Sequence, residues 1–267
     1  MIARAVQVAV ALMLSASTAF AQQAAEPPPP PADHAADRVY DPGVMAAARA
    51  NMHQEHGGET FSMVLVNIAE YQSLKGREAY RWEAEAWYGG DINRFVAKTE
   101  GEGTFGASSE RAEFQALYSR AIDRYLNLQA GLRYDVSPKP TRAYATIGVE
   151  GLAPYVIETT AALFVSDKGD ALARLEAYYD QLITQRLVLQ PRVEMNLAAQ
   201  DVRANDIGSG VVDIELGLRL RYELRREFAP YVGVSYERKT GRTADFARAA
   251  GEPVGGTAVV IGLHTWF

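Results

Sequence analysis

The sequence predicts an all-β protein: a closed antiparallel transmembrane β-barrel of about twelve strands, preceded by a short disordered N-terminal periplasmic tail. Three observations predict it. The chain opens with a stretch typical of an export signal, alternating apolar and charged residues recur from Thr60 onward, and an alternating segment ends at the aromatic Phe267. A soluble β-sandwich or lipocalin-like barrel also alternates, but it gives aromatic residues no reason to gather at strand ends.

Residues 1–21 resemble a secretory signal peptide. Arg4 supplies a positive charge, residues 5–16 form a mostly apolar stretch, and Ala19-Phe20-Ala21 fits the small-x-small pattern of a cleavage site. The apolar run is too short for a spanning helix, which needs about 20 residues. The chain has no cysteine, so we expect neither disulfides nor a lipid attached to a cysteine. These features predict export to the bacterial cell envelope.

Composition excludes some partners. The formal net charge is −6, whereas a nucleic-acid-binding domain needs a basic face, so we expect no nucleic-acid partner. No later run is long and apolar enough for a spanning helix, and the chain would therefore cross a membrane as strands.

Residues 22–59 differ in composition from the rest. Five consecutive prolines at 27–31 favour an extended chain. Asp41-Pro42 is a suitable start for a helix over 44–54, which would be marginal alone at roughly three turns. We interpret 22–59 as a flexible, proline-rich periplasmic tail and 60–267 as the barrel domain.

The segment 211–223 shows the strand pattern most clearly. Val212, Ile214, Leu216, Leu218, Leu220 and Tyr222 alternate with Asp213, Glu215, Gly217, Arg219, Arg221 and Glu223, which predicts one apolar and one charged face. Similar patterns place strands at 61–72, 80–88, 92–102, 110–120, 125–135, 143–151, 155–165, 171–181, 187–199, 211–223, 231–237 and 257–267.

The connections between these segments suggest the asymmetry of outer-membrane barrels, in which short periplasmic turns alternate with longer outer loops. The predicted short turns are 89–91, 121–124, 151–154, 182–186 and 224–230, and the predicted long loops are 73–79, 103–109, 166–170, 201–210 and 238–256. Aromatic residues near the strand ends, among them Tyr71, Tyr80, Tyr144, Tyr155 and Tyr231, fit the membrane interfaces.

Methionine and histidine gather in the tail. If 44–56 is helical, Met45, Met52 and His56 share one face and His53 flanks it. Thioethers with imidazole form a ligand set suited to copper, particularly Cu(I). The alternative, an alanine-rich tail that merely contains a few such residues, stays open.

Charged residues of both signs are expected inside the barrel. They are Arg81, Glu83, Glu85, Arg94, Lys98, Glu113, Arg133, Asp135, Glu158, Arg174, Glu176, Arg192, Glu194, Asp213, Glu215, Arg219 and Arg221. Salt-bridge networks and a carboxylate-lined cation path both explain them. The barrel segment contains one histidine, His264, so we expect no enzyme and name no catalytic residue.

Several strings carry a family resemblance. AWYGGD at 86–91, QAGLRYD at 129–135, GVEGLAPY at 148–155, TQRLVLQPRVE at 184–194, ELGLRLRYELRREFAPYVGV at 215–234 and the final TWF resemble, in this order and spacing, the copper-resistance protein B family. The resemblance covers about 60–267. It implies an outer-membrane barrel that binds copper and limits its entry or exports it, with periplasmic copper-handling proteins as partners.

This chain departs from the family pattern in its tail. Family members often carry long methionine- and histidine-rich repeats before the barrel, whereas this tail offers Met45, Met52, His53 and His56. One or two copper ions therefore fit better than high-capacity storage. We expect a monomer in outer-membrane lipid. The alternative function is a general or anion-selective pore without a metal role.

Overall fold

The computed structural model describes residues 34–56, 59–107 and 109–267. The predicted signal peptide and the proline run lie outside the described residues. The chain divides between Glu59 and Thr60 into two units, each of which is described by itself. None of the described helices combines the length and the apolar character needed to cross a membrane.

The N-terminal unit contains a short 3-10 helix, η1 (Ala35–Arg38), and the helix α2 (Pro42–His56). Asp41 begins α2, because its carboxylate oxygen Oδ1 accepts the backbone N–H groups of Gly43 at 2.9 Å and Val44 at 3.0 Å. Pro42 occupies the first turn, where its missing N–H costs nothing. The helix predicted over 44–54 is therefore present and extends two residues further at each end.

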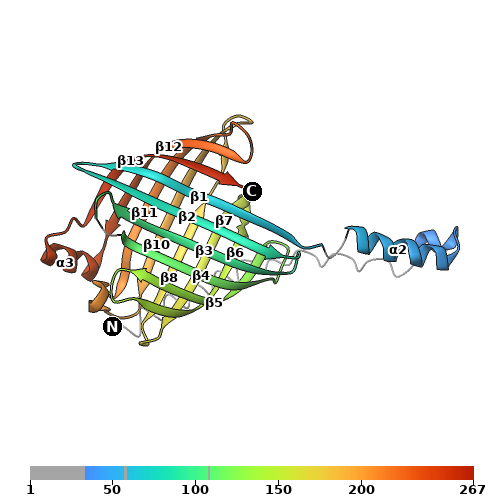
Figure 1. Ribbon diagram of the computed structural model, residues 1–267, viewed down its shortest axis with the longest axis horizontal. Coiled ribbons are helices and arrows are strands. Elements are labelled where there is room, and N and C mark those ends of the chain that lie inside the picture. Colours follow the sequence, from blue (N-terminus) through green and yellow to red (C-terminus); the bar gives the residue numbers. More distant parts are fainter. Residues whose placement is uncertain (1–33, 57–58, 108) are drawn as a thin grey trace. The chain divides into compact units, whose positions relative to one another are not determined.

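The second unit is a closed antiparallel barrel (Figure 1). Its strands are β1 (Phe61–Leu74), β2 (Arg77–Gly89), β3 (Asn93–Thr104), β4 (Ser109–Ala121), β5 (Leu126–Ser137), β6 (Arg142–Ala153), β7 (Ile157–Ser166), β8 (Ala171–Tyr178), β9 (Gln181–Leu182), β10 (Leu187–Ala198), β11 (Gly210–Tyr222), β12 (Phe228–Lys239) and β13 (Gly255–Trp266). Apart from β8 and β9, which both pair with β10, each strand pairs with its neighbour in sequence, and β13 returns to β1. Phe267 continues this last pairing: its N–H donates to the Val64 carbonyl at 2.9 Å.

One predicted strand, 171–181, is interrupted. Both β8 and β9 pair with β10, so together they form one of twelve positions in the wall. Tyr179 donates its N–H to the carbonyl of Pro191 on β10, which shows that the ring nitrogen of Pro191 faces the same side. Because proline has no N–H to donate, the ladder breaks at this point. The twelve-stranded barrel predicted from alternation is confirmed.

The faces of the strands are those of a membrane barrel. On β11, Leu216 is 49% exposed on the outside, whereas Arg219 is 2% exposed on the inside. Apolar side chains therefore form the outer surface and charged side chains fill the lumen, the reverse of a soluble barrel. Tyr71 and Tyr80 contribute to the outer surface, where both rings contact Phe105 with centroids 5.8 Å and 5.2 Å apart.

Some aromatic residues lie elsewhere than predicted. Tyr144 and Tyr231 are 4% exposed and belong to the interior, because strand alternation places them on the inner face. Tyr155 does not begin a strand. It lies with Val156 in the short turn η2 (Pro154–Val156), and both have left-handed backbones, with φ of 68° and 63°.

The connections also differ from the prediction. The β1–β2 loop is a tight turn at Lys75 and Gly76, because both flanking strands continue further than the polar sequence suggests, and the connection 167–170 has only four residues. The long connections are 199–209 and 240–254. Both lie at one end of the barrel, the loop end, and the other end is called the turn end. The turn predicted at 224–230 is shorter, since β12 begins at Phe228.

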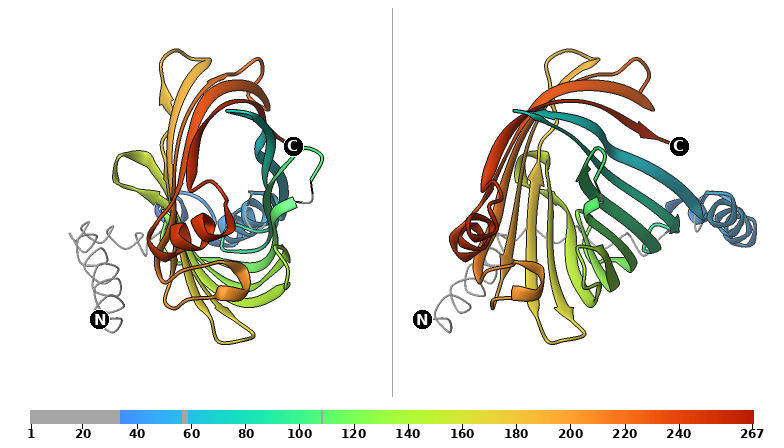
Figure 2. Two further views of the ribbon diagram at one scale, coloured as in Figure 1. Left: turned by 90° about the vertical axis from the view of Figure 1, so that its left-hand side faces the viewer. Right: turned by 60° about the vertical axis from the view of Figure 1, so that its left-hand side comes forward.

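The second long connection folds into a helix that the sequence pattern did not reveal, α3 (Gly241–Ala250). Figure 2 (left) shows it at the loop end, in front of the barrel. It packs on the loop 199–209, where Thr243 accepts the N–H of Gly208 at 2.9 Å. A side chain at Gly208 would lie 2.5 Å from the Cβ of Arg242, so the close approach of the loop to α3 needs glycine.

Candidate functional site: a belt of ion pairs, a lumen cavity and an N-terminal pocket

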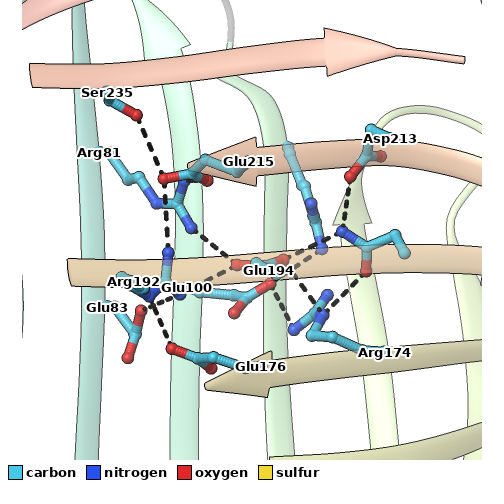
Figure 3. Close-up of polar contacts among 12 residues, drawn as sticks. Arg81, Glu83, Glu100, Arg174, Glu176, Arg192, Glu194, Asp213, Glu215 and Ser235 are labelled. Carbon is cyan, nitrogen blue, oxygen red and sulfur yellow. Dashed lines mark hydrogen bonds and ion pairs between the residues drawn. The ribbon is translucent and has the colours of Figure 1, made fainter. Parts of the chain in front are cut away.

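A belt of ion pairs crosses the lumen near its middle. Nine charged side chains form this belt, which we call the ion-pair belt: Arg81, Glu83, Glu100, Glu113, Arg174, Glu176, Arg192, Glu194 and Glu215. They reach the lumen because each stands on the inner face of its strand. Most are labelled in Figure 3, where they point toward one another from several strands.

Arg192, on β10, joins the largest number of carboxylates. Its guanidinium lies 2.6 Å from Glu176, 2.9 Å from Glu194, 3.0 Å from Glu83 and 3.4 Å from Glu215. Glu83 stands on β2, five strands around the barrel from β10. The contact between Arg192 and Glu83 therefore spans the lumen rather than joining neighbouring strands.

Arg174, on β8, makes a second crossing. Its guanidinium lies 2.6 Å from Glu100 on β3 and 2.9 Å from Glu113 on β4. Arg81, on β2, adds a third crossing, because it pairs with Glu215 and lies 3.1 Å from Glu194. The side chains of Arg192, Glu194 and Glu113 are between 1% and 3% exposed. In the described barrel these ion pairs bridge the lumen at mid-height.

The belt satisfies most of the hydrogen-bonding capacity of its members. Asn67 donates to Glu83 at 2.8 Å, and Asn196 donates to Glu194 at 3.0 Å. Such completeness matters because desolvating a charge costs several kcal/mol, which pairing offsets only when the geometry is good and the remaining donors and acceptors are used. The belt is therefore a network of paired, mostly buried charges rather than a loose set of surface charges.

A cavity of about 640 Å³ lies between the belt and the turn end. Eight carboxylates line it against four basic side chains, so its wall has a net negative charge. Lys98 is one of the four: its ammonium lies 3.1 Å from Glu85 and pairs with Glu150 across the cavity. A wall of this charge attracts cations and repels anions.

The N-terminal unit holds a second pocket, of about 330 Å³, and it contains part of the predicted metal site. Met45 and Met52 both line it, as their shared helical face predicts, and His34 joins them from the residue before η1. Arg49 fixes η1 against α2 through two hydrogen bonds to Asp37, at 2.6 Å and 3.1 Å. These bonds hold the pKa of the Asp37 carboxyl below its ordinary value.

The other two predicted ligands are placed only by their backbone. His53 and His56 belong to α2, with Met52 and His56 one turn apart, but their side chains lie outside what the structure describes. Spacing could not have found His34, because the fold of η1 and not the sequence register brings it to the pocket. Within residues 34–56, 59–107 and 109–267, no group of three or more histidine, cysteine, aspartate or glutamate side chains is arranged to hold a metal.

His264, the barrel histidine, lies on β13. Its Nδ1 is 3.4 Å from the carbonyl oxygen of Asn67, a residue at the bulge in β1. The ring is half-buried, as expected for a side chain that faces a lumen of charged neighbours. This contact fits a packing role.

Comparison with known proteins gives consistent results. A family model described as copper resistance protein B precursor (CopB) matches residues 60–267. Copper resistance protein B of Escherichia coli is 41% identical over 215 residues, which cover 80% of this chain and 72% of that protein. A copper resistance protein B homolog of Pseudomonas syringae pv. tomato is 40% identical, covering 80% of this chain and 73% of that protein.

Among solved structures, the NanC porin is similar, with a TM-score of 0.51 and 15% identity. The match covers 76% of this chain and 98% of the porin, and at this identity it shows a shared barrel fold alone. Neither the family description nor this neighbour's title names an enzyme. With its apolar outer surface, its charged lumen and a family match along the whole barrel, this chain belongs to the copper resistance protein B family of outer-membrane barrels, which serve copper resistance.

Proposed function

We propose that the protein binds copper(I) on its N-terminal unit and limits the passage of copper through the outer membrane. The observation that carries the proposal is that Met45, Met52 and His34 line the same pocket. Soft thioether ligands with imidazole suit Cu(I). His53 and His56, the other two predicted ligands, belong to the same helix.

The barrel supports the second half of the proposal. The ion-pair belt supports it, because buried ion pairs that bridge the lumen would obstruct the passage of copper. The acid-walled cavity disfavours the alternative of an anion-selective pore, since its net charge repels anions. Periplasmic copper-handling proteins, which the family resemblance implies, would deliver or receive copper at the N-terminal unit.

Competition with a chromogenic Cu(I) chelator tests the binding site. We expect the full-length protein carrying Met45→Leu and Met52→Leu to lose at least tenfold in Cu(I) affinity, because two soft ligands become alkyl groups of similar volume. Met195→Leu, on the barrel strand β10, is the matched control and should leave the affinity unchanged. Equal affinity of the double variant and the wild type would contradict the N-terminal site.

A further inference from the structure

Lys98 occupies an unusual place among the lumen charges. It stands on β3 directly opposite Glu85 on β2, and its ammonium also reaches Glu150 on β6. The three side chains keep 21%, 24% and 28% of their surface exposed, so they are open to the cavity. The triad has two negative charges and one positive charge, and its net charge is therefore −1.

The same cavity contains a polar group without a partner. Thr146, on β6, lines the cavity and is 6% exposed, and its Oγ1 makes no hydrogen bond within the described structure. Buried hydroxyl groups are nearly always hydrogen-bonded, so this one indicates polar contents in the cavity, such as water or a hydrated ion. Met63 lines the same cavity, on the strand next to Glu85.

Lysine differs from the arginines of the belt in a way that matters here. An ammonium is a compact, strongly hydrated point charge on a flexible four-carbon stem, whereas a guanidinium holds carboxylates in a fixed planar fork. Lys98 can therefore withdraw into the cavity, of about 640 Å³, without rearranging the strands. Its departure would leave Glu85 and Glu150 facing one another without a cation between them.

We propose that the lumen cavity is a binding site for a divalent metal cation, and that the Lys98 ammonium occupies the cation's place between Glu85 and Glu150. Two carboxylates with water as the remaining ligands form an oxygen site that divalent ions accept. Copper(II) binds such a site more tightly than the other divalent first-row ions. The site lies in the barrel and takes a hard-ligand ion, so it is independent of the Cu(I) pocket in the N-terminal unit.

Mn(II) binding, followed by electron paramagnetic resonance on the full-length protein in detergent, tests the proposal. Mn(II) prefers oxygen ligands, so the thioethers of the N-terminal unit do not compete for it. We expect Lys98→Met to raise the Mn(II) affinity on the order of tenfold or more, because a competing positive charge leaves the site. Adding Glu150→Gln to Lys98→Met should remove the gain. Cu(II) should follow the same order with higher affinities.

Lys168→Met is the matched control, since Lys168 is 66% exposed in a loop and lies 3.5 Å from Asp167. Equal Mn(II) affinity of Lys98→Met and Lys168→Met would overturn the proposal, as would a gain that survives Glu150→Gln. If Lys98→Met does not form a heat-modifiable barrel on gels, Glu150→Gln in the wild-type background is the deciding variant. Weaker Mn(II) binding than that of the wild type supports the site, and unchanged Mn(II) binding overturns it. Loss of Cu(I) binding by the Met45 and Met52 variants affects none of these outcomes.

Discussion

Arg192 shows how a single side chain can bridge the lumen. Its guanidinium supplies five N–H donors in a rigid fork, and Glu83, Glu176, Glu194 and Glu215 surround it. Burying one such charge costs several kcal/mol, which its partners offset only while all of them remain. Four carboxylates on a single arginine make the loss of that arginine more damaging than the loss of any one carboxylate.

Arg192→Met is expected to destabilise the barrel by about 3–5 kcal/mol, because it leaves several buried carboxylates without their cation. The measurement is the midpoint of urea unfolding in lipid vesicles, with Arg248→Met as the control. Arg248 is 59% exposed and pairs with Asp245 one helical turn away, so its removal should cost less than about 1 kcal/mol. Equal midpoints for the two variants would contradict the structural role of the belt.

Sequence alternation predicts which side chains enter the lumen but not how they pair. Arg192 and Glu194 follow directly from the inward face of β10, whereas the contact of Arg192 with Glu83 depends on closure of the whole barrel. The pattern does not predict Glu100 and Glu150 as lumen residues, because the outward positions near them include Gly101 and other small residues, which weaken the alternation. Tyr231 shows the opposite case. Its place near a predicted strand end favours the membrane interface, but its side chain lies inside the lumen.

At the scale of elements, α3 is the feature that periodicity could not reveal. It is ten residues long, and its inner face consists of the small residues Thr243, Ala244 and Ala247, which give little apolar signal. Its position depends on tertiary contacts with the loop 199–209. Asp201 makes one of them, because its carboxylate lies 3.1 Å from the guanidinium of Arg242 on α3, and it also accepts the N–H of Ser209 within the loop at 2.9 Å.

The contacts of Asp201 predict a pH dependence for this end of the barrel. The hydrogen bond from the Ser209 N–H, with a smaller contribution from Arg242, holds the pKa of Asp201 below the ordinary value of 3.8. A lowered carboxyl pKa contributes stability that is complete above that value and is lost as the pH falls below it toward the folded-state pKa. We therefore expect α3 to be docked at pH 6 and to become mobile on acidification below pH 3.8.

A spin label at Ala249→Cys can follow this change, since Ala249 is exposed and the chain has no other cysteine. The label should become more mobile in acid, and Asp201→Asn should make it mobile at both pH values. Mobility that responds neither to acid nor to Asp201→Asn would contradict the role of Asp201.

Strand positions were predictable and their ends were not. Each strand needs only a period of two, which the sequence displays, whereas the ends depend on turn geometry. The sequence predicts that Pro230 belongs to a turn, yet it pairs with Leu263 inside the β12–β13 ladder, since a proline fits a strand wherever its N–H is not needed. The tight turn at Lys75 and Gly76 was missed because the strand ends around it are polar.

At the scale of the whole barrel, the pairing of β1 with β13 closes the sheet. Side chains that alternate along each strand therefore point either into the lumen or to the outer surface. Phe267, exposed on the outer surface, completes this seam through its backbone bonds to Val64. The seam brings Arg81 and Glu83 on β2 within reach of the acids and arginines on β10 and β11. The belt and the acid-walled cavity are thus consequences of closure rather than of any one segment.

The most direct test of this account is the electrical conductance of the full-length wild-type protein in a planar lipid bilayer. A lumen closed by the ion-pair belt predicts insertion without steady ion current, while Arg192→Ala, which removes the central arginine and leaves its carboxylates, predicts a steady, cation-selective current. A steady current through the wild-type protein would contradict the closed lumen, and with it the proposal that the barrel limits the passage of copper.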